Sequence, residues 1–177
     1  HARYRSRLMQ TKPFARLIAT VFGTGNLKPA PGTWGSAVAI PLGWALHYAG
    51  GFPLLLVASV VVFGLGYWAT REATRGEADH DPSEIVIDEV VGLWIALFPL
   101  SFGMWRMGAE PHVFPWPGWV GAFLAFRLFD IWKPGPVGWA DRKGGPMGVM
   151  LDDVIAGLMA AVVVALAAAV AHGVLLR

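Results

Sequence analysis

The stretch His80–Gly92, which reads His-Asp-Pro-Ser-Glu-Ile-Val-Ile-Asp-Glu-Val-Val-Gly, decides how the chain is arranged. Five of the 12 acidic residues of the chain lie in it or directly before it, between Asp79 and Glu89. Asp81 followed by Pro82 is the pattern of an N-cap acid with proline at the first helical position. A helix is therefore predicted to begin at Pro82.

The acids of this predicted helix point to a cation. Glu84 and Asp88 are four residues apart and would share a face, where two like charges repel unless a cation lies between them. Asp88 and Glu89 lie too deep in the predicted helix to be caps, and they lead directly into an apolar run. Hard divalent ions such as Mg²⁺ prefer carboxylate oxygens. Helix capping remains an alternative for Glu84, and a solvated helix face for the other two acids.

Composition indicates a membrane protein. The chain has 177 residues, of which 55% are hydrophobic, and its mean hydropathy is +0.52. Only 15% of its residues are charged, against about 25% in soluble proteins. The absence of cysteine excludes a disulfide scaffold and a cysteine nucleophile. A net charge of +2 gives no indication of nucleic-acid binding.

The apolar segments predict an all-α, multi-pass membrane protein with about five membrane segments, at residues 37–49, 52–69, 88–102, 118–129 and 154–176. Gly50 and Gly51 would form the tight turn between the first two. The first segment is short for a full span of about 20 residues, so it either begins nearer Gly32 or crosses only part of the bilayer. Whether the third and fourth segments cross the bilayer fully or only partway also stays open.

The N-terminal 28 residues carry six basic side chains and no acid. By the positive-inside rule this end is predicted to be cytoplasmic. Residues 1–22 form a basic segment in which an interfacial helix is expected, and residues 1–177 are predicted to form one domain. With five spans, both acidic windows, residues 72–89 and 130–153, would face the cytoplasm together with the glycine-rich loop that follows residue 22.

That loop, residues 23–36, is predicted to be irregular because of its glycines and prolines. Its backbone N–H groups could cradle a phosphate, with Thr24, Thr33, Ser36 and Lys28 nearby. Its spacing does not match a P-loop, and a simple loop leading into the membrane is the alternative.

Two further groups of charges follow. Arg127, Asp130 and Lys133 repeat at three-residue steps and would share one side of a helix, so the acid could bind a metal and the cations phosphate oxygens. The alternative is that these three charges only neutralise one another at the membrane interface. A loop is expected around residues 141–145, and Asp152 and Asp153 then precede the last apolar segment. An N-cap needs only one of these two acids, and charges at membrane depth tend to mark function.

Four sequence blocks, in order, resemble the bacterial phosphatidylglycerophosphatase A family. They are Gly23-Thr-Gly with Pro31-Gly-Thr-Trp-Gly-Ser36, Ile85-Val-Ile-Asp-Glu-Val-Val-Gly92, Phe126-Arg-Leu-Phe-Asp-Ile-Trp-Lys-Pro134 and Gly148-Val-Met-Leu-Asp-Asp-Val-Ile-Ala-Gly157. The resemblance implies a Mg²⁺-dependent lipid phosphatase, a phosphoric monoester hydrolase that converts phosphatidylglycerophosphate to phosphatidylglycerol. It also implies the bacterial inner membrane, with the active site facing the cytoplasm.

With this resemblance, the expected metal ligands are Glu84, Asp88, Asp130 and Asp153, with Asp152 as an alternate. Glu89 is the expected general base, so that Asp88, Glu89 and Asp130 form the catalytic set. Lys28, Arg127 and Lys133 are expected to hold phosphate oxygens, beside Thr24, Thr33 and Ser36. Direct attack by water and an aspartyl-phosphate intermediate are both open.

A divalent-cation channel or carrier that uses the same carboxylates is the alternative function, and a membrane scaffold is a second one. A channel requires acids across the membrane depth, whereas here they gather toward one face. The expected partners are the phospholipid substrate and the bilayer, without nucleic acid, and no oligomeric state follows from the sequence.

Overall fold

The computed structural model describes residues 13–26, 31–73, 75, 86–110 and 115–175, and no strand occurs in this part of the chain. Its elements are η1 (Thr24–Asn26), α2 (Pro31–Ala73), α3 (Ile87–Arg106), α4 (Trp116–Trp132), α5 (Pro136–Lys143) and α6 (Gly145–Leu175). Residues 13–19 are also helical. The predicted all-α class is confirmed.

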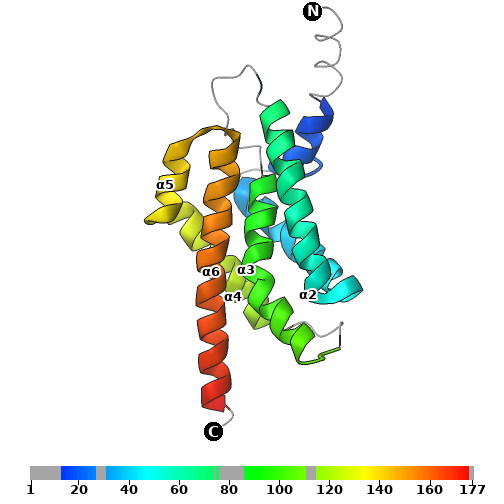
Figure 1. Ribbon diagram of the computed structural model, residues 1–177, viewed down its shortest axis with the longest axis vertical. Helices are drawn as coiled ribbons and strands as arrows, with labels where there is room; N and C mark the ends of the chain where they lie inside the picture. Colours follow the sequence, from blue (N-terminus) through cyan, green and yellow to red (C-terminus); the bar gives the residue numbers. More distant parts are fainter. Residues whose placement is uncertain (1–12, 27–30, 74, 76–85, 111–114, 176–177) are drawn as a thin grey trace, which may run out of the picture.

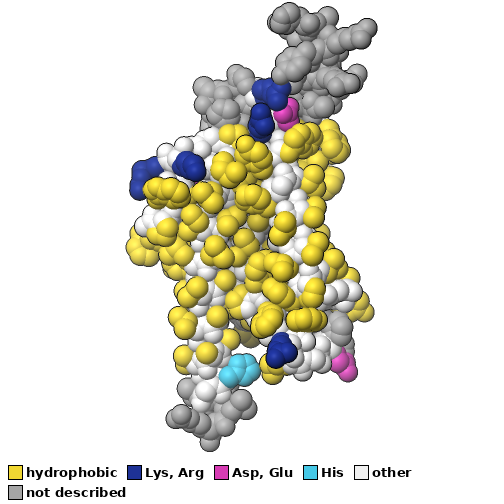
Figure 2. All heavy atoms as spheres, in the orientation of Figure 1, with side chains coloured by type: hydrophobic (Ala, Val, Ile, Leu, Met, Phe, Trp, Pro, Cys, Tyr) yellow, Lys and Arg dark blue, Asp and Glu magenta, His cyan; other side chains and the backbone are white. Residues whose placement is uncertain are grey.

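Three helices, α2, α3 and α6, are long and apolar enough to cross a membrane, among the residues that the structure describes. The predicted number of about five segments is therefore not confirmed. On the face shown in Figure 2, hydrophobic side chains cover the middle of the molecule and charged side chains lie toward its two ends. This distribution is typical of a membrane-spanning bundle.

Helix α2 is a hairpin of two arms. Gly51 breaks it with a φ of 66°, a left-handed conformation that glycine adopts readily. A Cβ atom at Gly51 would also lie 2.6 Å from Cδ1 of Trp105, so only glycine fits this turn. The turn predicted at residues 50–51 is confirmed. The first arm begins at Pro31, next to Gly32, which was the earlier of the two predicted starts of the first membrane segment.

Helix α3 is the centre of the bundle and packs against α2, α4 and α6 (Figure 1). Eleven of its residues are buried. The Trp94 indole donates to the carbonyl oxygen of Ala39 at 2.9 Å, and the His47 ring is hydrogen-bonded to the Ser101 hydroxyl at 2.7 Å. Both contacts satisfy polar groups that would be costly to bury alone, and they fix the first arm of α2 against α3.

The start of α3, the end of α4 and the start of α6 lie at the same end of the bundle (Figure 1). These are the helix ends that carry the acidic residues singled out above. Helix α6 projects beyond the other helices at the opposite end. The fold therefore gathers the candidate site at one end of the bundle.

Several predicted boundaries are wrong. The helix predicted to run from Pro82 through Asp88 is not continuous, because Val86, the N-cap of α3, has a non-helical φ of −131° and α3 begins at Ile87; Pro82 itself lies outside the described residues. Residues 31–36 belong to α2 and not to an irregular loop, and residues 141–143 of the loop expected at 141–145 form the end of α5, which spans Pro136–Lys143. Helix α6 begins at Gly145, so neither Asp152 nor Asp153 is an N-cap.

Candidate metal and phosphate site

Five acids form a single cluster at the gathered helix ends. Asp88, Glu89 and Asp153 each offer a carboxylate oxygen, and these oxygens lie within 4.8 Å of one another. Asp130, Asp152 and Asp153 form a second such group. Asp153 belongs to both groups, so the two are continuous. All four aspartates of the cluster are buried.

The first two acids are placed by the start of α3. The backbone N–H of Val86 donates to the carbonyl oxygen of Ala19 at 3.0 Å, and the helix begins one residue later. Asp88 and Glu89 therefore lie in the first turn, not deep in a helix as predicted. In a first turn the N–H groups have no intrahelical partners and the helix dipole favours negative charge, so the local backbone stabilises both carboxylates.

A close crossing of α3 and α6 brings Asp88 and Asp153 together. Gly92 lies one turn after Asp88, and Gly157 lies one turn after Asp153. A Cβ atom at Gly157 would clash with the carbonyl oxygen of Gly92, and it would lie 3.1 Å from the Gly92 Cα. The backbones can approach this closely only because both residues lack side chains. The aspartates one turn before the crossing consequently face each other.

The end of α4 supplies the cations. The Arg127 guanidinium pairs with Asp130 at 2.6 Å. Lys133 ends α4 in the left-handed conformation, with a φ of 53°. From there its ammonium group lies 2.8 Å from Asp152, 3.6 Å from Asp141 and 3.7 Å from Asp130. Lys133 thereby links α4 to both α5 and α6.

The pKa of Lys133 is raised above its ordinary value. Partial burial by itself lowers this pKa, but the hydrogen bond and charge of Asp152 outweigh it, and the charges of Asp130 and Asp153 act in the same direction. Lys133 therefore stays positively charged at any pH at which the protein is expected to work.

The N-terminus of α2 closes the site from another side. A Cβ atom at Gly32 would lie 2.7 Å from Oε1 of Glu89 and 3.3 Å from a guanidinium nitrogen of Arg127. The first N–H groups of a helix have no intrahelical acceptors and can bind an anion. The glycine thus lets the α2 backbone reach an acid and a cation of the site at once.

Some polar atoms of the site have no hydrogen-bond partner among the described residues. They are Oε2 of Glu89, Oδ2 of Asp153 and Nε of Arg127, and all three are buried. A buried carboxylate oxygen without a partner is costly. Oxygens grouped in this way suit a hard divalent cation, so the residues present fit a metal ion.

The remaining predicted site residues differ in their surroundings. Thr24 lies in η1 and Thr33 near the start of α2, and both are half-buried. Ser36 is fully buried, and its hydroxyl donates to the carbonyl oxygen of Gly32 at 2.8 Å. Glu84 and Lys28 lie outside the described residues. The roles of all these residues stay predictions.

Sequence reasoning missed the backbone contacts of Gly32, Gly92 and Gly157. A signal for two of them is present in the sequence: Asp88-Glu-Val-Val-Gly92 and Asp153-Val-Ile-Ala-Gly157 both place glycine four residues after an aspartate. Such a repeat indicates two helices that cross one turn beyond a pair of acids.

Comparison with known proteins gives one matching family model and several similar proteins. The family model described as phosphatidylglycerophosphatase A matches residues 17–168. Two proteins named phosphatidylglycerophosphatase A are similar to this chain. That of Escherichia coli is 36% identical over 89% of this chain and 84% of its own length. That of Haemophilus influenzae is 37% identical over 84% of this chain and 85% of its own length. A protein of Bacteroides thetaiotaomicron, provisionally named a phosphatidylinositol-3-phosphatase, is 40% identical over 85% of this chain and 91% of its own. No solved structure gives a significant match.

Proposed function

Because the chain belongs to the phosphatidylglycerophosphatase A family, we propose that the acidic cluster is the active site of a lipid phosphatase. The reaction is hydrolysis of the terminal phosphate monoester of phosphatidylglycerophosphate, which gives phosphatidylglycerol and phosphate. The observation that carries the proposal is the convergence of five acids, Arg127 and Lys133 at one end of an apolar helical bundle.

We propose Mg²⁺ as the cation of this site. Asp88, Asp130 and Asp153 are the proposed ligands, with Asp152 as an alternate, and each belongs to a group of acids whose oxygens could hold a metal ion. A bound divalent ion supplies charge neutralisation at the phosphoryl oxygens and lowers the pKa of a coordinated water. Glu84, predicted as a further ligand, keeps that role as a proposal based on the sequence.

The other residues of the site have roles that follow from their charge and position. Glu89, with one oxygen that has no hydrogen-bond partner among the described residues, takes the proton of the attacking water. Arg127 and Lys133 hold phosphate oxygens as charge-assisted donors. The first N–H groups of α2, at Gly32, add donors for the same phosphate.

The arrangement favours the enzyme over a channel or carrier. A translocation path requires polar groups through the depth of the membrane, whereas the five clustered acids lie at one end of the bundle. A phosphatase needs the opposite arrangement, because the headgroup of a lipid is at the membrane surface and its tails are in the bilayer. We propose that the protein lies in the bacterial inner membrane with the cluster on the cytoplasmic face; the basic N-terminal segment supports this orientation. We further propose that residues 1–177 act as one domain.

The experiment is release of phosphate from phosphatidylglycerophosphate by purified protein in detergent, with and without Mg²⁺. We expect release that requires Mg²⁺ and that falls by about a hundredfold or more in Asp88→Asn. Glu110→Gln, a few residues beyond the end of α3 that is remote from the cluster, is the control and should keep wild-type activity. An active Asp88→Asn protein would show that the cluster is not the active site.

A further inference from the structure

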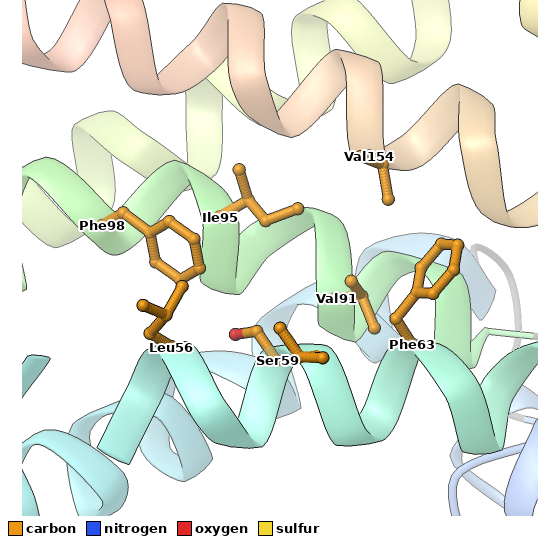
Figure 3. A pocket seen from close by; sticks show the side chains of 8 residues that line it. Leu56, Ser59, Phe63, Val91, Ile95, Phe98 and Val154 are labelled. Atoms are coloured by element: carbon orange, nitrogen blue, oxygen red, sulfur yellow. The ribbon is translucent and has the colours of Figure 1, made fainter. Parts of the chain in front are cut away.

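An apolar groove runs along one face of the bundle, between α2, α3 and α6. Seven hydrophobic side chains and one serine line it: Leu56, Ser59, Val60 and Phe63 of α2, Val91, Ile95 and Phe98 of α3, and Val154 of α6. Figure 3 shows the side chains of α2 and α3 facing each other across it, with that of Val154 above. Its volume is about 280 Å³, close to the lower limit of about 300 Å³ for a small-molecule pocket.

The groove lies on the same side of α3 as Asp88 of the acidic cluster, one turn further along the helix. On α3, Asp88, Val91, Ile95 and Phe98 follow one another at steps of three and four residues, so they lie along a single face of the helix. On α6, Val154 directly follows Asp153. Asp88 and Asp153 thus each lie within one helical turn of a residue that lines the groove.

The lining suits hydrocarbon. The one hydroxyl in it, that of Ser59, donates to the carbonyl oxygen of Leu55 at 2.7 Å, so it does not require a polar partner in the groove. From Val91 to Phe98 the α3 backbone rises about 10 Å at 1.5 Å per residue. The groove is also open at its side, because Val60 is 65% exposed.

We propose that this groove holds the upper part of one acyl chain of the lipid substrate and so sets the depth at which the phosphate meets the cluster. The inference rests on the proposed phosphatase function. A lipid phosphate has its anionic group and its hydrocarbon joined in one molecule, and α3 carries a carboxylate of the cluster and the hydrocarbon-lined groove one turn apart on the same side. The occupant is therefore the chain of the bound substrate, and an unrelated bilayer lipid is the outcome that the test must exclude.

The test compares two neighbouring exposed valines of α2. Val60 lines the groove, whereas Val61, which is 53% exposed, does not. Val60→Trp should obstruct the groove and raise KM for long-chain phosphatidylglycerophosphate about tenfold, equivalent to about 1.4 kcal/mol. It should leave kcat/KM unchanged for the same headgroup without acyl chains. Val61→Trp should behave as wild type with both substrates.

Four outcomes are informative. Equal effects of the two variants, no effect of Val60→Trp, or an equal loss with the deacylated headgroup would each overturn the groove assignment. If the wild-type protein hydrolyses neither substrate, the phosphatase proposal itself has failed, and this result is distinct from the other three.

A second measurement needs no substitution. Wild-type protein is irradiated with a phosphatidylglycerophosphate analogue that carries a photoreactive group on one acyl chain. We expect crosslinks at residues 56–63 and 91–98 that unlabelled substrate suppresses. Labelling that is equally strong at exposed residues of α6 such as Leu166, and that unlabelled substrate does not reduce, would show that bilayer lipids occupy the groove without selection.

Discussion

Gly157→Ala is expected to inactivate the protein through the crossing of α3 and α6. A methyl group at this position meets the backbone of Gly92, whose Cα would be 3.1 Å away. Carbon atoms pack at about 3.5–4.0 Å, so the helices must separate locally by about 0.5–1 Å. Backbone cannot rotate away as a side chain can, and the overpacking costs about 1–3 kcal/mol.

This separation acts directly on the cluster, because Asp88 and Asp153 lie one turn from the crossing. A misplacement of about 1 Å lowers catalysis by roughly a hundredfold, and we expect kcat/KM to fall by about that factor. For a chain of this size the destabilisation lowers Tm by about 2–12 °C. Phosphate release and thermal unfolding in detergent measure the two effects separately.

Gly173→Ala is the matched control on the same helix, since a Cβ atom there has no neighbour within 4 Å among the described residues. Its Tm should be unchanged or slightly higher, because alanine has the greater helix propensity. Wild-type kcat/KM and Tm in Gly157→Ala would refute the reasoning, because the crossing would then tolerate a side chain. A lower Tm with unchanged kcat/KM would show that the crossing stabilises the bundle but does not position the acids.

Two further substitutions test the cations and the α2 N-terminus. Lys133→Met removes the hydrogen bond to Asp152 and a proposed phosphate contact, so kcat/KM should fall about tenfold to a hundredfold, as expected for a loss of about 1.5–3 kcal/mol. Steady-state phosphate release measures this change. Lys143 is exposed and lies outside the cluster, so the control Lys143→Met should retain wild-type activity. Ser36→Ala should change kcat/KM by less than about threefold, because the Ser36 hydroxyl already donates to the Gly32 carbonyl oxygen and one such hydrogen bond contributes about 1 kcal/mol. A hundredfold loss of kcat/KM in the same assay would instead indicate that the hydroxyl contacts the phosphate directly.

The sequence was sufficient for the features that depend on neighbouring residues. The turn at Gly50-Gly51 followed from two glycines between apolar runs, and the triad of Arg127, Asp130 and Lys133 followed from helical spacing. Both appear in the structure, with Arg127 and Lys133 on either side of Asp130.

Features that depend on distant residues could not be predicted in the same way. The residue before α3, Val86, donates its backbone N–H to the carbonyl oxygen of the distant Ala19, a contact that no local capping pattern indicates. Helix α6 extends back to Gly145, and the approach of Gly92 to Gly157 depends on which two helices pair. Periodicity describes the face of one helix but does not identify the partner of that face.

The projection of α6 has a consequence for the bilayer. The chemistry is confined to one end of the helices, so their other ends are free of any constraint from the acids. A thicker or thinner membrane can then be accommodated by tilt or by local adjustment at that far end, at a cost of fractions of a kcal/mol per Å. The cluster would keep its depth below the headgroups in either case. A change in membrane thickness would thus be taken up mainly at the end of the bundle that is remote from the acids.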